Sequence, residues 1–270
     1  MSFKTLSEGA QGETVKQLQS YLDDVGHYDG MIDGDYGPMT KEAVLSYQKA
    51  QDLIVDGVAG PQVWQTLESG IRDQKLLSEA DIGRAAKRLK LPKAVIKAFA
   101  DVESGPYGGF FDNGHATILF ERHIMNRRCK EYGLELLAQI ARKERPDLVL
   151  GKPGGYRGGK NEIPRLTKAA ELNPICARES CSWGAYQIMG YHWQRLGYQS
   201  VEDFVSAMQT SEGKQLDALV AFIKADPDLH EALKERDWAR VAEIYNGPAY
   251  EKNEYDLKLE EAFHRFSSKK

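Results

Sequence analysis

The sequence predicts a mostly α-helical protein of two units, a compact three-helix bundle over residues 1–70 and an α+β domain with a minor β-hairpin over residues 78–270. Apolar residues recur at helical spacing in both parts of the chain. A Gly-rich turn that leads into a helix occurs twice within the first part. Charge is also divided unevenly. Residues 1–70 carry a net charge of −7 and the whole 270-residue chain carries −4, so residues 71–270 carry +3. An acidic first unit argues against nucleic-acid binding, and the contrast supports two units of different character.

The composition is that of a globular protein, with 41% hydrophobic residues, 28% charged residues and a mean hydropathy of −0.53. No apolar run is long enough to span a bilayer, so we expect no stable membrane association. The first residues lack the basic start and apolar core of a signal peptide. We therefore expect that the protein is made in the cytoplasm and that any action elsewhere requires a separate means of release from the cell.

The cysteine pattern argues against a disulfide framework and against a metal centre. Cys129, Cys176 and Cys181 are an odd and sparse set, which favours reduced thiols. The pair Cys176 and Cys181 lacks the second pair that a zinc site needs, and no His-Glu-x-x-His motif occurs. We expect no metal and no other cofactor.

Short helices account for the first unit. Val15, Leu18 and Leu22 define one face of a first helix. Thr40 is placed to cap a second helix that runs to about Ala50. A third helix follows the second copy of the repeated turn, and together the three helices make a bundle with room for a surface groove only.

The internal repeat consists of Asp33-Gly-Asp-Tyr-Gly-Pro38 and Asp56-Gly-Val-Ala-Gly-Pro61. Each copy brings a proline to the first turn of a helix, which is a favourable position for proline. The stretch from Glu68 to Lys75 is polar and predicts a linker, which we place at residues 71–77. The second unit is therefore expected to begin at residue 78.

Two helices open the second unit. Ser78, with Asp81 three residues later, predicts a capped helix that extends to about Lys90. The apolar spacing from Pro92 to Glu103 predicts a second amphipathic helix, and Gly105-Pro106 ends it directly after the glutamate.

Glu103 is the first candidate for chemistry. It lies at the edge of the apolar face and at the C-terminal end of the helix dipole, and both desolvation and the dipole raise a carboxyl pKa. A carboxylic acid that stays protonated near neutral pH can act as a general acid. The alternative is a solvated glutamate at a helix end.

Two further carboxylates follow closely. Residues 107–115 form a Gly-rich turn region and residues 116–120 predict a strand, so that Asp112 and Glu121 lie on or beside a hairpin. Glycoside hydrolysis needs one protonated carboxyl and a second group that places water or stabilises positive charge. The alternatives are a turn role for Asp112 and a salt bridge with an arginine for Glu121.

The remaining motifs each have a structural explanation when they are taken alone. The basic, Gly-rich segment 151–160 predicts a connecting loop, with a mobile lip on a cleft as the alternative. Ser182 can cap the turn after it, and Gln187 is expected to be a buried amide among apolar neighbours. Residues 237–248 predict a capped helix that carries Tyr245 and ends at Asn246-Gly-Pro.

The first unit resembles the peptidoglycan-binding module of cell-wall hydrolases. The matching positions are Leu6, Gly9, Gly12, Val15, Leu18-Gln19, Leu22, Asp33-Gly-Asp-Tyr-Gly37, Thr40, Ala43-Val44, Gln48, Asp56-Gly57, Gly60-Pro61, Trp64 and Leu67. The resemblance implies that the loops around Tyr28, Asp33, Tyr36 and Asp56 flank a shallow wall-binding groove, although the backbone of the Asp-Gly turns also explains these residues.

The second unit resembles the lysozyme superfamily, and most closely the N-acetylmuramidase domain of modular phage endolysins. The motifs are Val102-Glu-Ser-Gly105, Ile118-Leu-Phe-Glu-Arg-His123, Trp183-Gly-Ala-Tyr-Gln-Ile-Met-Gly190 and Ala242-x-x-Tyr-Asn-Gly-Pro248, within roughly residues 78–266. The resemblance implies a mostly helical lysozyme-like α+β fold with the cleft between lobes. It implies that Glu103 is the catalytic acid and that Gln187, Tyr245, Asn246, Tyr186 and Ser182 bind the glycan.

The expected function is that of a phage endolysin, a monomer that hydrolyses the β-1,4 bond between N-acetylmuramic acid and N-acetylglucosamine in peptidoglycan. It would act on the wall, in the periplasm of a Gram-negative host, after holin-type release. Relatives differ in whether they use a second carboxylate, so Asp112 and Glu121 stay open. A lytic transglycosylase that gives 1,6-anhydro-muramyl products is the first alternative, and a non-catalytic wall-binding or phage structural protein is the second.

Overall fold

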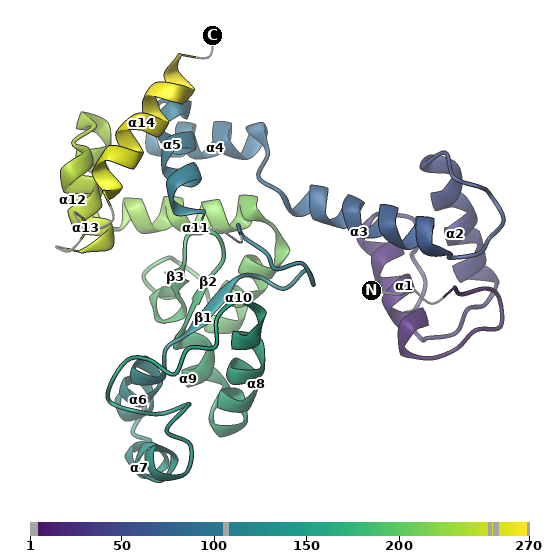
Figure 1. Cartoon of the computed structure of the whole chain (residues 1–270), viewed down its shortest axis with the longest axis horizontal. Coiled ribbons are helices and arrows are strands. Elements are labelled where there is room, and N and C mark those ends of the chain that lie inside the picture. The colour runs from purple at the N-terminus through teal and green to yellow at the C-terminus, as the bar shows by residue number, and fades with distance from the viewer. Residues whose placement is uncertain (1–4, 105–107, 248–249, 251–253, 269–270) are drawn as a thin grey trace. The chain divides into compact units, whose positions relative to one another are not determined.

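The computed structural model describes residues 5–104, 108–247, 250 and 254–268 (Figure 1). The chain divides into two compact units, Met1–Lys75 and Leu76–Lys270. As the sequence predicts, the fold is mainly helical with a small antiparallel sheet. No helix of the described part is long and apolar enough to cross a membrane.

The first unit contains three helices, α1 (Glu13–Asp24), α2 (Pro38–Ala50) and α3 (Pro61–Lys75). Their apolar faces meet in one core, whose most buried members are Val15, Leu18, Leu22, Val44, Tyr47, Trp64 and Leu67. Single antiparallel bridges, Leu6 with Ala59 and Gln11 with Asp35, fasten the loops beside the helices.

The internal repeat has a shared physical basis that the helix pattern did not reveal. In the first copy the buried amide of Gln19 donates to the Asp33 carboxylate at 2.8 Å and accepts from the backbone N–H of Gly34 at 2.9 Å. In the second copy Gln48 donates to Asp56 at 2.8 Å and accepts from the N–H of Gly57 at 2.9 Å. Each Asp-Gly turn is therefore held by a glutamine from the preceding helix.

Two details of the first unit differ from expectation. Thr40 does not cap α2, because the helix already begins at Pro38 and the Thr40 hydroxyl is buried against the Asp35 carbonyl at 3.2 Å. The predicted linker at 71–77 is largely helical, since α3 continues to Lys75. Residues 71–75 contain no proline and consist mostly of good helix formers, so a polar composition alone did not mark the boundary.

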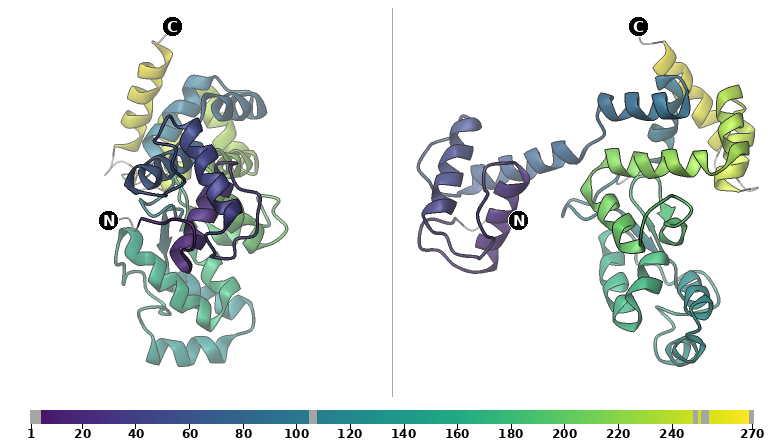
Figure 2. Two further views of the ribbon diagram at one scale, coloured as in Figure 1. Left: turned by 90° about the vertical axis from the view of Figure 1, so that its right-hand side faces the viewer. Right: turned by 180° about the vertical axis from the view of Figure 1, so that it is seen from behind.

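The second unit consists of two groups of helices with the sheet between them (Figures 1 and 2). On one side lie α4 (Glu79–Leu89), α5 (Lys93–Glu103), α11 (Glu212–Lys224), α12 (Pro227–Glu235), α13 (Trp238–Asn246) and α14 (Tyr255–Ser267). On the other side lie α6 (Arg122–Glu131), α7 (Glu135–Glu144), α8 (Glu162–Leu172) and α9 (Pro174–Glu179). The segment after the sheet forms α10 (Val201–Thr210), and single 3-10 turns cover Gly159–Asn161 and Gly190–His192.

The sheet is formed by β1 (Ile118–Phe120), β2 (Cys181–Trp183) and β3 (Ile188–Met189), in that order and antiparallel. Ile118 pairs with Trp183 and Phe120 with Cys181. The expected hairpin beside β1 is reduced to a single bridge between Phe110 and Ala116, and the main partner of β1 comes from more than sixty residues later. Local sequence could not reveal that non-local partner.

The helix that carries Glu103, α5, is held by its packing against α4 and the core of the second unit. Ser78 and Asp81 form the expected capping box of α4, which packs beside α5. Val95, Ile96 and Phe99 of α5 are buried in the core that also contains the apolar face of α11. The C-terminal end of α5 thus reaches the junction between the helical group and the sheet (Figure 1).

Candidate active site

Glu103 is the last residue of α5 and its carboxyl is largely removed from solvent. Burial raises its pKa to about 7, and a hydrogen bond with the side chain of Asn246 partly opposes the rise. Its Oε1 atom is buried and has no hydrogen-bond partner within the described residues. A carboxyl that is close to half-protonated at neutral pH is suited to act as a proton donor.

Asn246 and Tyr245 come from the end of α13. The Tyr245 ring packs edge-on against Phe99 of α5, with ring centroids 4.9 Å apart, and its hydroxyl donates to the backbone carbonyl of Tyr186 at 3.0 Å. Tyr245 therefore fastens the segment after β2 to the helix that bears Glu103. Burial, and then the nearby charge of Glu103, raise the pKa of the Tyr245 hydroxyl well above its usual range.

Strand β2 contributes Ser182, and the turn after it contributes Gln187. The buried Ser182 hydroxyl donates to the Gln187 side-chain carbonyl at 2.7 Å, and the Gln187 amide donates to the backbone carbonyl of Gly184 at 2.8 Å. Gln187 is exposed, which corrects the expectation of a buried amide, and its backbone has a positive φ of 46°. The side-chain hydrogen bonds of Gln187 are made within the turn between β2 and β3. Its amide group therefore has partners although the residue is exposed.

Glu121 is the residue directly before α6, at the end of β1. Its backbone N–H donates to the Ser180 carbonyl at 2.9 Å. Its carboxylate contacts His123, with Nδ1 and Oε2 3.0 Å apart, and accepts from the Tyr156 hydroxyl at 2.8 Å. This half-buried carboxylate is thus hydrogen-bonded by a tyrosine and lies within ion-pair distance of a histidine, where the sequence suggested an arginine.

Asp112 lies in an exposed turn next to the Phe110–Ala116 bridge. Backbone hydrogen bonds close that turn, from Phe111 N–H to the His115 carbonyl and from Gly114 N–H to the Phe111 carbonyl, both at 2.9 Å. The Asp-Asn-Gly sequence is typical of such a turn, so the turn alone explains Asp112. Of the two candidates, Glu121 is the one whose carboxylate has side-chain contacts with described residues.

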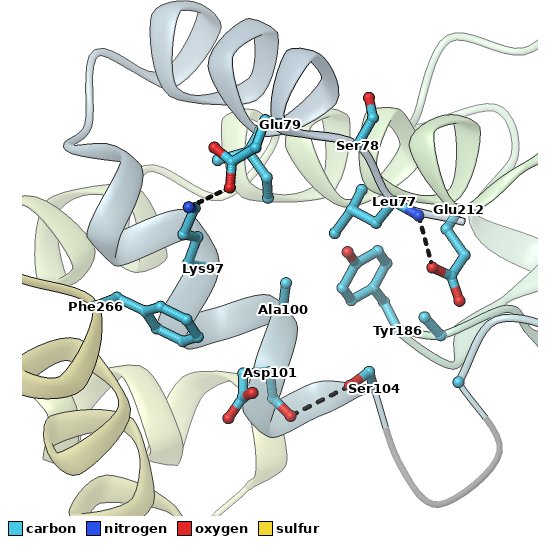
Figure 3. A pocket seen from close by; sticks show the side chains of 13 residues that line it. Leu77, Ser78, Glu79, Lys97, Ala100, Asp101, Ser104, Tyr186, Glu212 and Phe266 are labelled. Carbon is cyan, nitrogen blue, oxygen red and sulfur yellow. Dashed lines mark hydrogen bonds and ion pairs between the residues drawn. The ribbon is translucent and has the colours of Figure 1, made fainter. Parts of the chain in front are cut away.

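A pocket of about 370 Å³ opens beside the end of α5 (Figure 3). Ala100 of α5 and Ser104, the residue after this helix, form part of its wall, and the buried Tyr186 forms another part. Glu212 closes one side, because its carboxylate accepts from the backbone N–H groups of Leu77 and Gly109, each at 2.9 Å. Of the predicted glycan-binding residues, Tyr186 is the one that lines this pocket.

The first-unit residues that the resemblance to a peptidoglycan-binding module pointed to make structural contacts within that unit. Tyr28 and Tyr36 are buried, at 7% and 1% exposure, with their hydroxyls bonded to the carbonyls of Met31 and Gly57. Their rings therefore offer no face to a glycan. The carboxylates of Asp33 and Asp56 hold the two turns, as described above, and their acidic pKa values are lowered mainly by hydrogen bonds from those turns and their glutamines.

Sequence reasoning missed the exposed apolar pairs Met31-Ile32 and Ile54-Val55, which precede the two Asp-Gly turns at equivalent positions. It also missed Tyr156, on the loop that was expected to be a plain connection, and Tyr255 at the start of α14, whose pKa is raised by burial and then by the charge of Glu103. The repeat itself was a usable signal for the apolar pairs. No sequence signal linked Tyr156 to Glu121.

Two family models match the chain. The N-acetylmuramidase family model matches residues 92–267, well over half of the chain. The chain belongs to the N-acetylmuramidase family. That match includes α5 with Glu103, the sheet and α13, and a peptidoglycan-binding domain model matches residues 11–67.

A solved structure is similar over nearly the whole length of this family member. The crystal structure of Burkholderia AP3 phage endolysin aligns with a TM-score of 0.70 at 45% identity, covering 98% of this chain and 99% of that one. Both the muramidase fold and the modular organisation expected from the sequence are thereby confirmed.

Curated relatives match over short segments. The N-acetylmuramoyl-L-alanine amidase CwlM of Mycobacterium tuberculosis is 41% identical over 21% of this chain and 14% of its own length. The zinc D-Ala-D-Ala carboxypeptidase of Streptomyces albus G is 46% identical over 23% and 26%, and the spore cortex-lytic enzyme of Bacillus subtilis 42% over 24% and 22%. The chain thus spans about a quarter or less of these relatives.

The described residues contain no group of three or more His, Cys, Asp or Glu side chains that could hold a metal ion. Cys129, Cys176 and Cys181 are buried free thiols in the second unit. Burial raises the pKa of the Cys181 thiol well above its usual range, which makes it a poor nucleophile.

Proposed function

We propose that this protein is an endolysin that hydrolyses the β-1,4 bond between N-acetylmuramic acid and N-acetylglucosamine in bacterial peptidoglycan, with Glu103 as the general acid. The observation that supports it most is the Glu103 carboxyl at the end of α5, whose pKa is raised by burial to about 7 and therefore suits a proton donor at neutral pH. Membership of the N-acetylmuramidase family and the similarity to a phage endolysin supply the substrate class.

In the proposed reaction Glu103 gives its proton to the glycosidic oxygen as the bond from that oxygen to the anomeric carbon breaks. A water molecule forms the new bond to the anomeric carbon, and Glu121 accepts the proton that this water loses. One water is consumed, and the products are a reducing N-acetylmuramic acid end and a free hydroxyl on the leaving sugar.

The binding roles follow the same geometry. Asn246 orients the Glu103 carboxyl, and Tyr245 holds the segment that contains Tyr186. Ser182 of β2 and Gln187 of the turn after it supply hydrogen-bonding groups, and Gln187 is exposed. The first unit attaches the enzyme to the wall, where the protein would act in the periplasm of a Gram-negative host at lysis.

The test is mass spectrometry of muropeptides released from purified peptidoglycan by the wild type, Glu103→Gln and Glu121→Gln. Reducing muramic acid ends that are lost in both variants support the proposal. Anhydro-muramyl ends that persist in Glu121→Gln identify a lytic transglycosylase, in which no water attacks and Glu121 is not a base. Absence of any glycan cleavage by the wild type contradicts an enzymatic role altogether.

A further inference from the structure

The Gly-rich loop between α7 and α8 is held in one conformation by Arg122, the first residue of α6. The Arg122 guanidinium donates to the backbone carbonyls of Lys152 at 3.0 Å and Pro153 at 2.9 Å. Gly154 and Gly155 follow with positive φ values of 108° and 77°. A Cβ at Gly155 would meet the Arg122 guanidinium at 3.3 Å, so glycine lets the loop pass close over the arginine.

A buried ion pair on α8 holds the far side of the same loop. Glu162 and Arg165 are 0% and 1% exposed and pair with each other. Glu162 accepts from the backbone N–H groups of Arg157 and Gly158, the latter at 3.0 Å. Arg165 donates to the carbonyl of Phe120 at 3.2 Å, so one pair fastens both the loop and the strand end that precedes Glu121.

A buried pair of this kind is costly to desolvate, and it contributes a defined geometry more than net stability. Here the geometry that it defines is the approach of the loop to the end of β1. The residue between the two anchored parts of the loop is Tyr156.

The Tyr156 hydroxyl lies 2.8 Å from Oε2 and 3.0 Å from Oε1 of Glu121, so its one proton is shared across the carboxylate. On another side, Nδ1 of His123 lies 3.0 Å from Oε2. The Tyr156 ring itself is 46% exposed, so packing does not require it at this place. Its hydroxyl is the part with a defined partner.

We propose that Tyr156 is a positioning residue for Glu121, which aims the carboxylate at the attacking water and is held for that purpose by Arg122 and the Glu162–Arg165 pair. This inference rests on the proposed function, because it assigns Glu121 the role of base. Without the phenol, the carboxylate can rotate about its last side-chain bond, and fewer encounters with the bound glycan are productive.

The experiment compares Tyr156→Phe with the wild type on soluble, uncrosslinked glycan strands. The variant keeps the exposed ring and loses the hydroxyl. We expect kcat to fall about tenfold, as for the loss of one hydrogen bond to a charged group, while KM and the melting temperature stay unchanged.

Tyr132→Phe is the matched control. Tyr132 is also partly exposed, at 44%, and its hydroxyl also donates to a glutamate, the buried Glu179, at 2.9 Å. That carboxylate joins α6, α9 and the segment after β3, through Arg128 and Trp193, and no part of the proposed reaction uses it. We expect this variant to melt at a lower temperature with kcat unchanged.

The outcomes separate the inference from the proposed function. If Glu121→Gln abolishes cleavage and Tyr156→Phe retains the wild-type kcat, the positioning role is wrong and the proposed function stands. If Tyr156→Phe behaves like Tyr132→Phe, losing stability but no kcat, its hydroxyl is a structural contact and the inference is also overturned. If Glu121→Gln cleaves at the wild-type rate, the base assignment fails first and removes the ground for the inference.

Discussion

At the scale of single residues, the proposed chemistry depends on the environment of the Glu103 carboxyl. Its pKa of about 7 means that the protonated form is abundant up to neutral pH and is lost above it. If the protonated form is the proton donor, kcat/KM on soluble glycan should decline above about pH 7. Initial rates from pH 5 to pH 9 test this, with circular dichroism at each pH to verify folding. A rate that stays constant to pH 9 would show that another group supplies the proton.

The same carboxyl has a stability consequence with a definite sign. The folded-state pKa is raised from 4.5 to about 7, so the folded protein binds the proton more tightly than the unfolded chain does. The contribution of Glu103 to the free energy of unfolding is fully present below pH 4.5 and is lost as the pH rises through the folded-state pKa of about 7. The full loss is at most about 3.5 kcal/mol, since each unit of pKa is worth about 1.4 kcal/mol.

Glu103→Gln should therefore be more stable than the wild type at pH 8 and nearly equal to it at pH 4.5. The neutral amide does not ionise, so it avoids the cost of a buried charge. Thermal unfolding of both proteins at the two pH values measures the difference. Glu135→Gln, at an exposed residue in the first turn of α7, is a suitable control that should show no such gain at pH 8. Equal melting temperatures at pH 8 would show that the Glu103 site is better solvated than its burial indicates.

How far the sequence predicts the site also differs from residue to residue. Glu103 could be located because helix periodicity and a Gly-Pro stop are local signals, and together they place the glutamate at a helix end. The partners of Glu121 could not be found, because Tyr156 lies 35 residues away on a loop whose path depends on Arg122 and Arg165. Gln187 was expected to be buried because its neighbours are apolar, but a local turn satisfies its amide at the surface.

At the scale of elements, caps and helix spans were predictable and element partners were not. Ser78 and Asp81 cap α4, and Asp237 caps α13, as the local sequence indicates. The partner of β1 required a contact between distant segments, and the polar end of α3 carried no signal against helix. Local propensity decides an element's type, whereas its neighbours are decided by the packing of the whole domain.

The two glutamine-held turns of the first unit give a prediction at this scale. Gln19 is fully buried and bonds Asp33, Thr40 and the N–H of Gly34. Gln19→Ala would leave the buried N–H of Gly34 without its acceptor and would remove the amide that donates to Asp33 and Thr40, at a cost of about 2–3 kcal/mol. We expect faster amide hydrogen exchange across residues 33–37 in the intact protein.

Gln17→Ala provides the control, because Gln17 lies exposed on the same helix and its amide contacts only the next turn, at Tyr21. Exchange at residues 33–37 should be unchanged in that variant. If Gln19→Ala also leaves the exchange unchanged, backbone conformation alone holds the Asp-Gly turn. The second copy allows an independent repetition of the experiment, with Gln48→Ala and exchange at residues 56–60.

At the scale of the whole molecule, the proposed function assigns attachment to the first unit and chemistry to the second. The peptidoglycan-binding domain model and the N-acetylmuramidase model match separate stretches, 11–67 and 92–267, and each unit has its own core. Attachment through the first unit raises the local concentration of glycan around the second, without any change in the catalytic groups. The benefit should depend on whether the substrate is a large wall or a short soluble chain.

Removal of residues 1–75 should therefore weaken action on intact sacculi by about tenfold to a hundredfold and leave the rate on short soluble glycan within a factor of two. The boundary at Lys75 is chosen because α3 ends there and the remaining unit keeps its complete core. Turbidity clearance of sacculi and reducing-end release from soluble strands give the two rates. Equal losses on both substrates would mean that the first unit supports the catalytic unit itself. If the truncated protein matches the full-length rate on both substrates, attachment contributes nothing to lysis.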